Sequence, residues 1–199
     1  MNIQFQLALL LSIMGIIFIL LGMSYKIPIF LHLDTRFTQS LNNYLFPYRG
    51  FFRYIWPLGT NPVAVVLIGI CFIPGWIAGI LVSIVYIIMS LFEIQIKNNL
   101  KRKRPFQGEM SINNYQPTHP IDPSYPSGDA MRAWFLAIIL SWIFALNFIG
   151  IVISCLVAVL ISTGRISLGV HYVFDVIGGS GLGILGAGIA LFLKQILFV

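Results

Sequence analysis

The sequence predicts an all-α, polytopic membrane protein, and three properties of the 199-residue chain lead to this prediction. Hydrophobic residues make up 58% of the chain and charged residues only 9%. The mean hydropathy is +0.92. Apolar runs recur along the chain, several of them close to the length of about 20 residues that a bilayer span needs. Because so few polar side chains could not cover a water-exposed surface, we expect a single membrane-embedded domain, residues 1–199.

Six apolar runs predict six transmembrane helices. They lie at residues 5–21, 61–73, 76–96, 130–146, 148–162 and 173–193. The first run has neither a positive segment before it nor a cleavage pattern after it, so we expect a retained span. Pro74 and Gly75 leave room for only a tight turn after the second run, which predicts a helical hairpin. Gly179 and Gly183 in the last run have GxxxG spacing, which predicts close helix packing.

The segment between the first two runs predicts an amphipathic helix along the membrane interface. Asp34 is a favourable N-cap for this helix. Apolar residues follow at helical spacing on one face, namely Phe37, Leu41, Tyr44 and Leu45. Aromatic residues at 51–56 continue the segment, and such belts commonly anchor a protein in the interface. Anchoring is therefore favoured over a role in gating substrate.

In a second long loop, residues 97–127, four closely spaced prolines forbid a continuous helix, namely Pro117, Pro120, Pro123 and Pro126. We expect this loop to form a cap beside a polar pocket. Cys71 and Cys155 both lie inside apolar runs without histidine or cysteine neighbours. Neither a disulfide nor a zinc site is therefore expected.

Five cations crowd residues 97–104, directly after the third run. Taken alone, such a cluster is typical of a topology signal or of a site for anionic lipid headgroups. Arg165, at the end of a different run, changes the interpretation. Together with Lys97 and Arg104 it could surround a phosphoryl group, whose oxygens match the planar fork of arginine.

Two further pairs of residues fit the same chemistry. Ser127 and Gly128 precede an apolar run, so Ser127 can cap a helix whose free N–H groups bind phosphate. Gly128 allows close approach of the backbone. His171 and Asp175 are four residues apart at the start of the last helix, on one face. The carboxylate can orient the imidazole and make its other nitrogen a nucleophile.

In order and spacing these residues resemble the three-part signature of the type 2 phosphatidic acid phosphatase superfamily, which comprises integral membrane lipid phosphatases and is related to vanadium haloperoxidases. The first part is Lys97, six residues, then Arg104-Pro105. The second part is Pro-Ser-Gly-His in the family and Pro126-Ser127-Gly128-Asp129 here. The third part is Ser-Arg, five residues, His, three residues and Asp in the family, and it stands here as Gly164-Arg165, His171 and Asp175.

The resemblance implies a hydrolase for membrane lipid phosphates that needs no metal or other cofactor. Lys97, Arg104 and Arg165 would hold the phosphate, and Ser127 and Gly128 would add hydrogen bonds. His171 would attack phosphorus, Asp175 would orient it, and water would hydrolyse the phosphohistidine. Possible substrates are phosphatidic acid, phosphatidylglycerol phosphate, lipid A phosphate and a polyprenyl diphosphate. The expected partners are this lipid and the bilayer, and no nucleic acid.

Two positions depart from the family pattern. Gly164 replaces a serine, and Asp129 replaces the histidine that would protonate the leaving alkoxide. A carboxylate with a pKa of about 4 is a poor proton donor at neutral pH. Asp129 could be a catalytic acid with a raised pKa, or cap the helix and pair with Arg132, or the leaving group could need little protonation. The last alternative favours a polyprenyl diphosphate; His119 is another candidate donor.

The same residues fit two other functions. A lipid-to-lipid phosphotransferase would use the same phosphohistidine with an acceptor hydroxyl in place of water. A catalytically weakened lipid-phosphate binder would explain Asp129, although it would not need an oriented histidine. For localisation, the resemblance implies a bacterial inner membrane with the pocket facing the periplasm or exterior. The distribution of Lys and Arg predicts the inverse orientation, and we prefer the one that the family implies.

Overall fold

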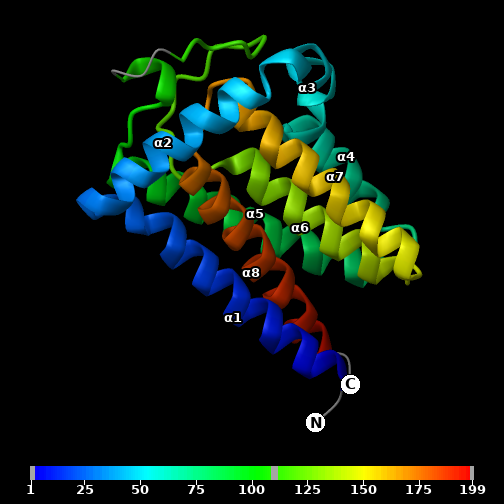
Figure 1. Ribbon diagram of the computed structural model, residues 1–199. Coiled ribbons are helices and arrows are strands. Elements are labelled where there is room, and N and C mark those ends of the chain that lie inside the picture. Colours follow the sequence, from blue (N-terminus) through cyan, green and yellow to red (C-terminus); the bar gives the residue numbers. More distant parts are fainter. Residues whose placement is uncertain (1–2, 109–111, 198–199) are drawn as a thin grey trace.

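A computed structural model describes residues 3–108 and 112–197, and this part of the chain is helical apart from turns and one long loop (Figure 1). Its α-helices are α1 (Ile3–Met23), α2 (Pro28–Tyr44), α3 (Arg49–Ile55), α4 (Asn61–Ile70), α5 (Trp76–Leu100), α6 (Gly128–Ile143), α7 (Phe148–Ser167) and α8 (Val173–Leu197). All six apolar runs coincide with helices, so the predicted all-α class is confirmed.

Fewer than six helical segments of the described part meet the length and hydropathy expected of a span. In the described part, four helical segments are long and apolar enough to cross a membrane, namely Ile3–Lys26, Trp76–Gln107, Phe148–Ser167 and Val173–Leu197. A bent pair, Phe46–Gly59 with Asn61–Ile70, would make a fifth span, with an angle of 54° between its halves. Helix α4 has only 10 residues and α6 only 16. The chain is an integral membrane protein, and the count of six spans stays a prediction.

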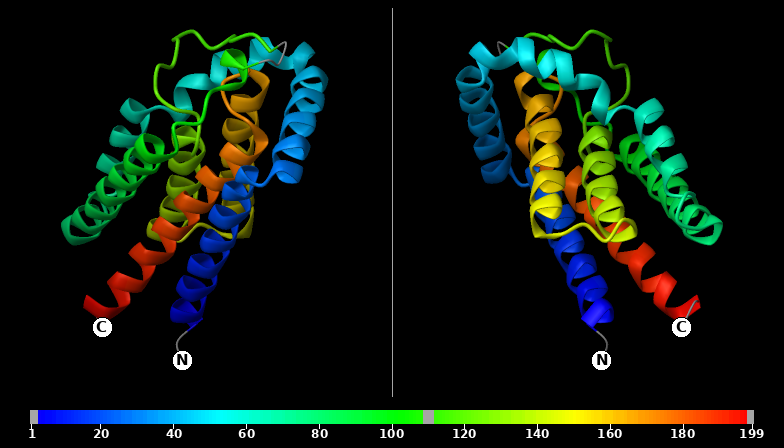
Figure 2. Two further views of the ribbon diagram at one scale, coloured as in Figure 1. Left: turned by 90° about the vertical axis from the view of Figure 1, so that its left-hand side faces the viewer. Right: turned by 90° about the vertical axis from the view of Figure 1, so that its right-hand side faces the viewer.

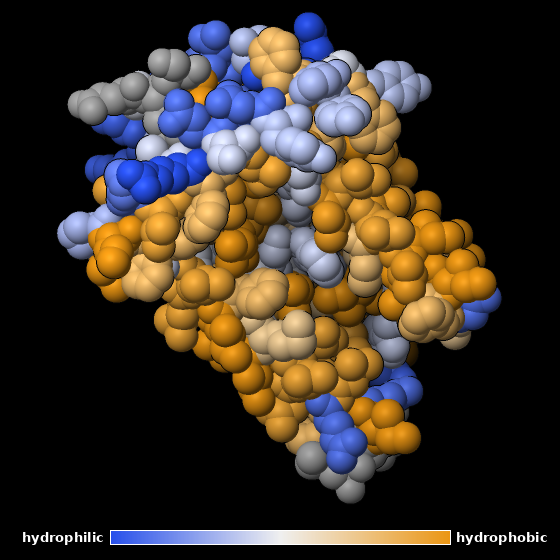
Figure 3. Space-filling view, in the orientation of Figure 1, coloured by the Kyte–Doolittle hydropathy of each residue, from blue (hydrophilic) through white to orange (hydrophobic). Residues whose placement is uncertain are grey.

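The helices form a bundle with a polar end and an apolar body. Helices α1 and α8 lie side by side, α6 packs between α8 and α7, and α4 and α5 form the predicted hairpin (Figures 1 and 2). Helices α2 and α3 and the long loop lie across the end opposite to both termini. Hydrophilic residues gather mainly at this end, and apolar residues cover the helices below it (Figure 3).

Helix α8 is packed closely on both sides through its glycines. A Cβ atom on Gly179 would lie 2.2 Å from the carbonyl oxygen of Ser127, and one on Gly183 would lie 2.2 Å from that of Met131. Toward α1, a Cβ atom on Gly181 would lie 2.7 Å from the carbonyl oxygen of Gly15, and one on Gly188 would lie 2.9 Å from the backbone nitrogen of Ser12. The predicted close packing is therefore confirmed, and it fixes α8 against the first turn of α6.

Helix α2 differs from the prediction in one important respect. It begins at Pro28, six residues before Asp34, because proline is well suited to the first turn of a helix. Asp34 is therefore not the N-cap, and its side chain is fully buried on the inner face of the helix. Phe37 and Tyr44 are exposed, whereas Leu45 is buried. The predicted apolar face is thus divided between the protein and its surroundings.

Candidate active site

A polar cavity of about 300 Å³ lies at the hydrophilic end of the bundle. Its wall comes from residues 56–62, the C-terminal end of α5, the first turn of α6, the long loop and the turn before α8. Five predicted site residues line it, namely Lys97, Arg104, Gly128, Asp129 and His171. The three parts of the sequence pattern therefore meet in one place.

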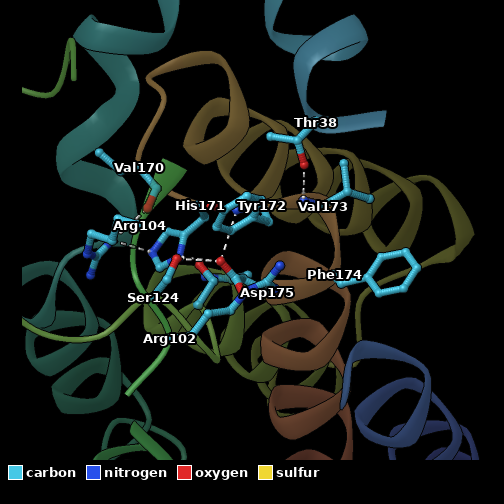
Figure 4. Close-up of polar contacts among 12 residues, drawn as sticks. Thr38, Arg102, Arg104, Ser124, Val170, His171, Tyr172, Val173, Phe174 and Asp175 are labelled. Atoms are coloured by element: carbon cyan, nitrogen blue, oxygen red, sulfur yellow. Dashed lines mark hydrogen bonds and ion pairs between the residues drawn. The ribbon is translucent and has the colours of Figure 1, made fainter. Parts of the chain in front are cut away.

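His171 lies in the turn between α7 and α8, and only 3% of it is exposed. Its Nε2 atom lies 3.2 Å from Nη1 of Arg104, which also donates to the carbonyl oxygen of Val170 at 2.8 Å (Figure 4). Burial, together with the charge of Arg104, lowers the pKa of His171 to about 4. The imidazole is therefore neutral at pH 7 and keeps the lone pair that a nucleophile needs.

Asp175 lies behind His171, on the side away from Arg104 (Figure 4). Its carboxylate accepts hydrogen bonds from Ser124 Oγ at 2.5 Å and from the Tyr172 N–H at 2.9 Å. Arg102 Nη1 lies 2.6 Å from the other oxygen. The distance from Asp175 to His171 Nδ1 is 3.6 Å, which is longer than a hydrogen bond. The predicted pair is brought together, with the Ser124 hydroxyl 3.5 Å from the same ring nitrogen.

Arg102 is buried at the centre of this arrangement. Its guanidinium lies between the rings of Tyr25 and Tyr172, at 3.9 and 4.0 Å from their centroids. It bridges Asp34 at 2.5 Å and Asp175 at 2.6 Å. Arg102 was grouped by sequence with cations that mark topology or bind lipid headgroups, and its burial corrects that interpretation for this residue. Stacking and bidentate pairing are properties of arginine that lysine does not share.

Helix α2 also supplies the caps for the first turn of α8. Asp34 Oδ1 accepts a hydrogen bond from the Phe174 N–H at 2.9 Å. Thr38 Oγ1 accepts one from the Val173 N–H at 3.0 Å (Figure 4). The first N–H groups of a helix have no partner within the helix itself. Side chains from a distant helix provide these partners here.

Two of the predicted phosphate-binding cations share an internal carboxylate. Asp122, in the long loop, lies 2.5 Å from Lys97 Nζ and 2.8 Å from Arg104 Nη2. The Arg104 Nε–H also donates to the main-chain oxygen of Asp122 at 2.9 Å. Burial alone would raise the pKa of Asp122, but Lys97 and Arg104 outweigh it and lower the pKa to about 2. An anion therefore already lies between these two cations.

A second internal carboxylate occupies the position of the missing histidine. Asp129 lies 3.1 Å from Arg165 Nη1 and 2.7 Å from Arg132 Nη2. Arg165 also donates to Gln116 Oε1 at 3.2 Å and to the carbonyl oxygen of Trp56 at 2.7 Å. Arg165 is 1% exposed and does not line the cavity itself. It contacts Asp129 and Gln116, which both line the cavity. Two guanidinium groups stabilise the ionised carboxylate, which favours the alternative in which Asp129 pairs with Arg132.

Ser127 is the N-cap of α6, as predicted, and accepts a hydrogen bond from the Ala130 N–H at 3.4 Å. It is fully buried and does not contribute to the cavity wall, so its role in phosphate binding stays a prediction. Gly128 does line the cavity. A Cβ atom there would lie 2.2 Å from Oε1 of Glu93, so a side chain at this position would displace that carboxylate.

His119 lies apart from the reacting groups. Its ring packs edge-on against Phe106, with 4.9 Å between the centroids, and lies 3.0 Å from the side chain of Asn114. Its neighbours Thr118 and Pro120 line the cavity, whereas His119 is exposed. The geometry gives no support to His119 as the proton donor.

Cys71 and Cys155 are both free thiols. Within residues 3–108 and 112–197, no group of three or more His, Cys, Asp or Glu side chains could hold a metal ion.

Comparison with known proteins shows the family of the chain. The sequence profile of the PAP2 superfamily matches residues 74–197, more than half of the chain, so the protein belongs to that superfamily. A transmembrane PAP2 type phosphatidylglycerolphosphate phosphatase from Bacillus subtilis has a similar structure, with a TM-score of 0.73 and 22% identity over 92% of this chain and 95% of the other. Aquifex aeolicus LpxE has a TM-score of 0.68 and 28% identity over 80% of this chain and 94% of the other. No curated protein sequence matches the chain.

Sequence reasoning missed three polar residues of this region. Ser124 and Arg102 both donate hydrogen bonds to the carboxylate of Asp175. Asp122 forms ion pairs with Lys97 and Arg104. Arg102 lies inside the first motif, and its sequence position was interpreted only as part of a cluster of positive charges. Asp122 is a carboxylate in a loop that otherwise supplies cations to the site. That difference in charge could have predicted an ion pair between Asp122 and those cations. Ser124 had no signal beyond its place just before the second motif.

Proposed function

We propose that the protein is a membrane lipid phosphatase that works through a phosphohistidine on His171. The observation that carries this proposal is a neutral, buried imidazole beside Arg104, at 3.2 Å, in the wall of a polar cavity at one end of a membrane bundle. Membership of the PAP2 superfamily supports it. The solved relatives named as a phosphatidylglycerolphosphate phosphatase and as LpxE point to a lipid-linked phosphate as substrate.

In the proposed reaction the substrate phosphate takes the place of the Asp122 carboxylate against Lys97 and Arg104. Asp175 holds the ring while Nε2 of His171 attacks phosphorus and the bond to the leaving oxygen breaks. Water then attacks the phosphohistidine and releases phosphate. Fixed cations that meet the charge of the phosphoryl group stabilise the transition state without reorganisation. The first N–H groups of α6, at Gly128, can add hydrogen bonds to an anion.

The ionised state of Asp129 bears on the choice of substrate. A phosphate monoester releases an alkoxide, which needs a proton, and a carboxylate held by Arg132 and Arg165 has none to give. A diphosphate releases a phosphate, which is a stable anion at neutral pH. We therefore rank lipid diphosphates, polyprenyl diphosphates in particular, ahead of monoesters.

For localisation we propose a bacterial inner membrane with the cavity facing the periplasm. Family membership is the support, and the many cations at the cavity end argue against it by the positive-inside rule. The test is a cysteine at Asn113, which is exposed, in a variant with Cys71 and Cys155 replaced by serine. An impermeant thiol reagent should label it on intact cells. Labelling only after permeabilisation would reverse the proposed orientation.

The catalytic proposal is tested by phosphate release from lipid phosphates and diphosphates in detergent. His171→Ala should abolish release and also the acid-labile phosphoenzyme trapped on quenching. His119→Ala, the matched control, should keep full activity. Asp129→His should raise monoester turnover relative to diphosphate turnover. A fully active His171→Ala variant would overturn the mechanism, and label transferred only to an added lipid alcohol would indicate a phosphotransferase.

A further inference from the structure

One cation in the cavity wall has no counterpart in the three-part signature. Arg132 lies one helical turn after Asp129 on α6 and is 9% exposed. It lines the cavity that contains His171. It also lines an adjoining cavity of about 260 Å³, whose wall includes Lys97 but not His171. Arg132 therefore stands where the two cavities meet.

The contacts of Arg132 fix one edge of its guanidinium and leave the other less constrained. The Nε–H donates to the carbonyl oxygen of Gly59 at 2.8 Å, and Nη2 donates to Asp129 at 2.7 Å. These bonds use two of the five N–H groups. The Nη1 atom lies 3.5 Å from Glu93, a longer ion pair. Because the guanidinium is planar and rigid, these two bonds also fix the direction of Nη1, and an anion would bind its N–H groups beside Glu93 or in place of it.

Asp129 and Arg132 form a local pair at the position where the family pattern has a proton donor. Their spacing of three residues places both side chains on one face of α6. The carboxylate holds Arg132 on one side and Arg165 on the other. A guanidinium does not donate its proton at neutral pH, but it stabilises an oxygen that becomes negative. This pair therefore suits a leaving group that departs as an anion.

We propose that Arg132 binds the leaving phosphate of a lipid diphosphate, so that a fixed cation replaces the proton donor. This inference rests on the proposed function and names its leaving-group site. The terminal phosphate would lie in the cavity of His171, and the lipid-linked phosphate would lie toward the adjoining cavity, against Arg132. Asn61, Lys97 and Asp122 also belong to both walls.

The chemical step balances without a proton. Nε2 of His171 forms a bond to the terminal phosphorus, and the bond from that phosphorus to the bridging oxygen breaks. The electron pair stays on the bridging oxygen, which departs as part of a lipid monophosphate. Water then attacks the phosphorus of the phosphohistidine, and the bond from Nε2 to phosphorus breaks. The oxygen and both protons of the water leave with the inorganic phosphate. His171 returns to its neutral form.

The test compares two substrates that differ in what leaves. Farnesyl diphosphate releases a phosphate, whereas p-nitrophenyl phosphate releases a phenolate that needs no proton and no second phosphate site. Arg132→Gln should lower kcat/KM for farnesyl diphosphate by about 10- to 100-fold, the effect of losing one charged hydrogen bond. Turnover of p-nitrophenyl phosphate should change by less than about threefold. Arg132→Lys, which keeps the charge, should give an intermediate loss. An equal loss on both substrates would overturn the proposal.

A binding measurement tests the same site without turnover. In the His171→Ala background, Arg132→Gln should weaken binding of farnesyl diphosphate about tenfold and leave binding of inorganic phosphate unchanged. Equal weakening of both ligands would place Arg132 at the terminal phosphate and overturn the inference. This binding measurement does not depend on formation of a phosphohistidine. If His171 were not the nucleophile, the His171→Ala variant would still release phosphate, and that separate result would contradict the proposed function.

Discussion

Two clusters of ion pairs lie on opposite sides of His171, and they differ in exposure. The rear cluster comprises Asp34, Arg102 and Asp175, whose side chains are 0%, 6% and 0% exposed. The cavity cluster comprises Lys97, Arg104 and Asp122 together with Arg132, Arg165 and Asp129. The carboxylates of Asp122 and Asp129 are 47% and 16% exposed, whereas Glu93, which pairs with Lys97 and Arg132, is 8% exposed.

The difference in exposure indicates different roles: the rear cluster supports His171, and the cavity cluster exchanges an internal carboxylate for a substrate phosphate. Removing one partner of a buried ion pair leaves an uncompensated charge and is strongly destabilising, whereas partly exposed pairs contribute little to stability. The rear cluster therefore holds the nucleophile, and the cavity cluster holds cations whose internal anions a substrate can replace. Four predictions test this contrast, beginning with the largest effect.

Arg102→Met should have the largest effect, because it leaves the carboxylates of Asp34 and Asp175 buried without their cation. We expect a loss of about 3–5 kcal/mol in the free energy of unfolding. Thermal unfolding in detergent measures this loss. Lys103→Met is the matched control, since that neighbouring cation is exposed. An unchanged melting temperature for Arg102→Met would remove the distinction between the two clusters.

Ser124→Ala should have the next largest effect, because it removes the 2.5 Å hydrogen bond to Asp175. We expect kcat to fall about tenfold or more, because a hydrogen bond to a charged group contributes about 1.5–3 kcal/mol and about 1.4 kcal/mol is tenfold in rate. KM should stay within about twofold, because Ser124 does not line the cavity. Ser180→Ala is the control, as this buried hydroxyl bonds only within α8 in the described part of the chain. A rise in KM with constant kcat would contradict a positioning role.

Asp122→Asn should strengthen inhibition by inorganic phosphate about three- to tenfold, because the internal anion that competes for Lys97 and Arg104 is lost. Stability should change by less than about 1 kcal/mol, as for other partly exposed pairs. Phosphate inhibition constants at fixed pH measure the effect. Asp122→Glu keeps the charge and should behave more like the parent. Weaker phosphate binding in Asp122→Asn would mean that this carboxylate aligns the cations instead of competing for them.

The smallest expected effect is that of pH. The pKa of His171 is lowered to about 4, so the neutral imidazole is present at every pH above that value and is lost only as the pH falls through it. The kcat at saturating substrate should therefore change little between about pH 8 and pH 5. An imidazole with an ordinary pKa of about 6.5 would lose most of its activity by pH 5.5. A midpoint near that ordinary value would show that the charge of Arg104 and burial do not act on the ring.

Much of the cavity could be predicted from the sequence, because the residues concerned lie at helix ends. Lys97 and His171 mark the ends of apolar runs, and ends on the same side of the membrane lie at the same level. The pairing of Asp129 with Arg132 was also foreseen as an alternative, since residues three apart on a helix are neighbours. Local spacing was enough for these contacts.

The rear cluster could not be predicted in the same way, because its contacts join distant segments. The burial of Arg102 depends on how α2 crosses the start of α8, which no local pattern specifies. Asp34 was assigned to a cap by its propensity, but it caps another helix, α8, through the Phe174 N–H. Asp122 reaches the cations only because the long loop folds back over the cavity.

The capping of α8 by Asp34 and Thr38 has a practical consequence for work on the purified protein. Helix α2 lies at the end of the bundle and has exposed apolar residues, so it contacts whatever amphiphile surrounds the protein. A short-chain detergent that lifts α2 would withdraw both caps, and with Asp34 it would remove one of the two carboxylates that pair with Arg102. Such a preparation would keep its helices and still lose activity, and adding back lipid would be the way to recover it.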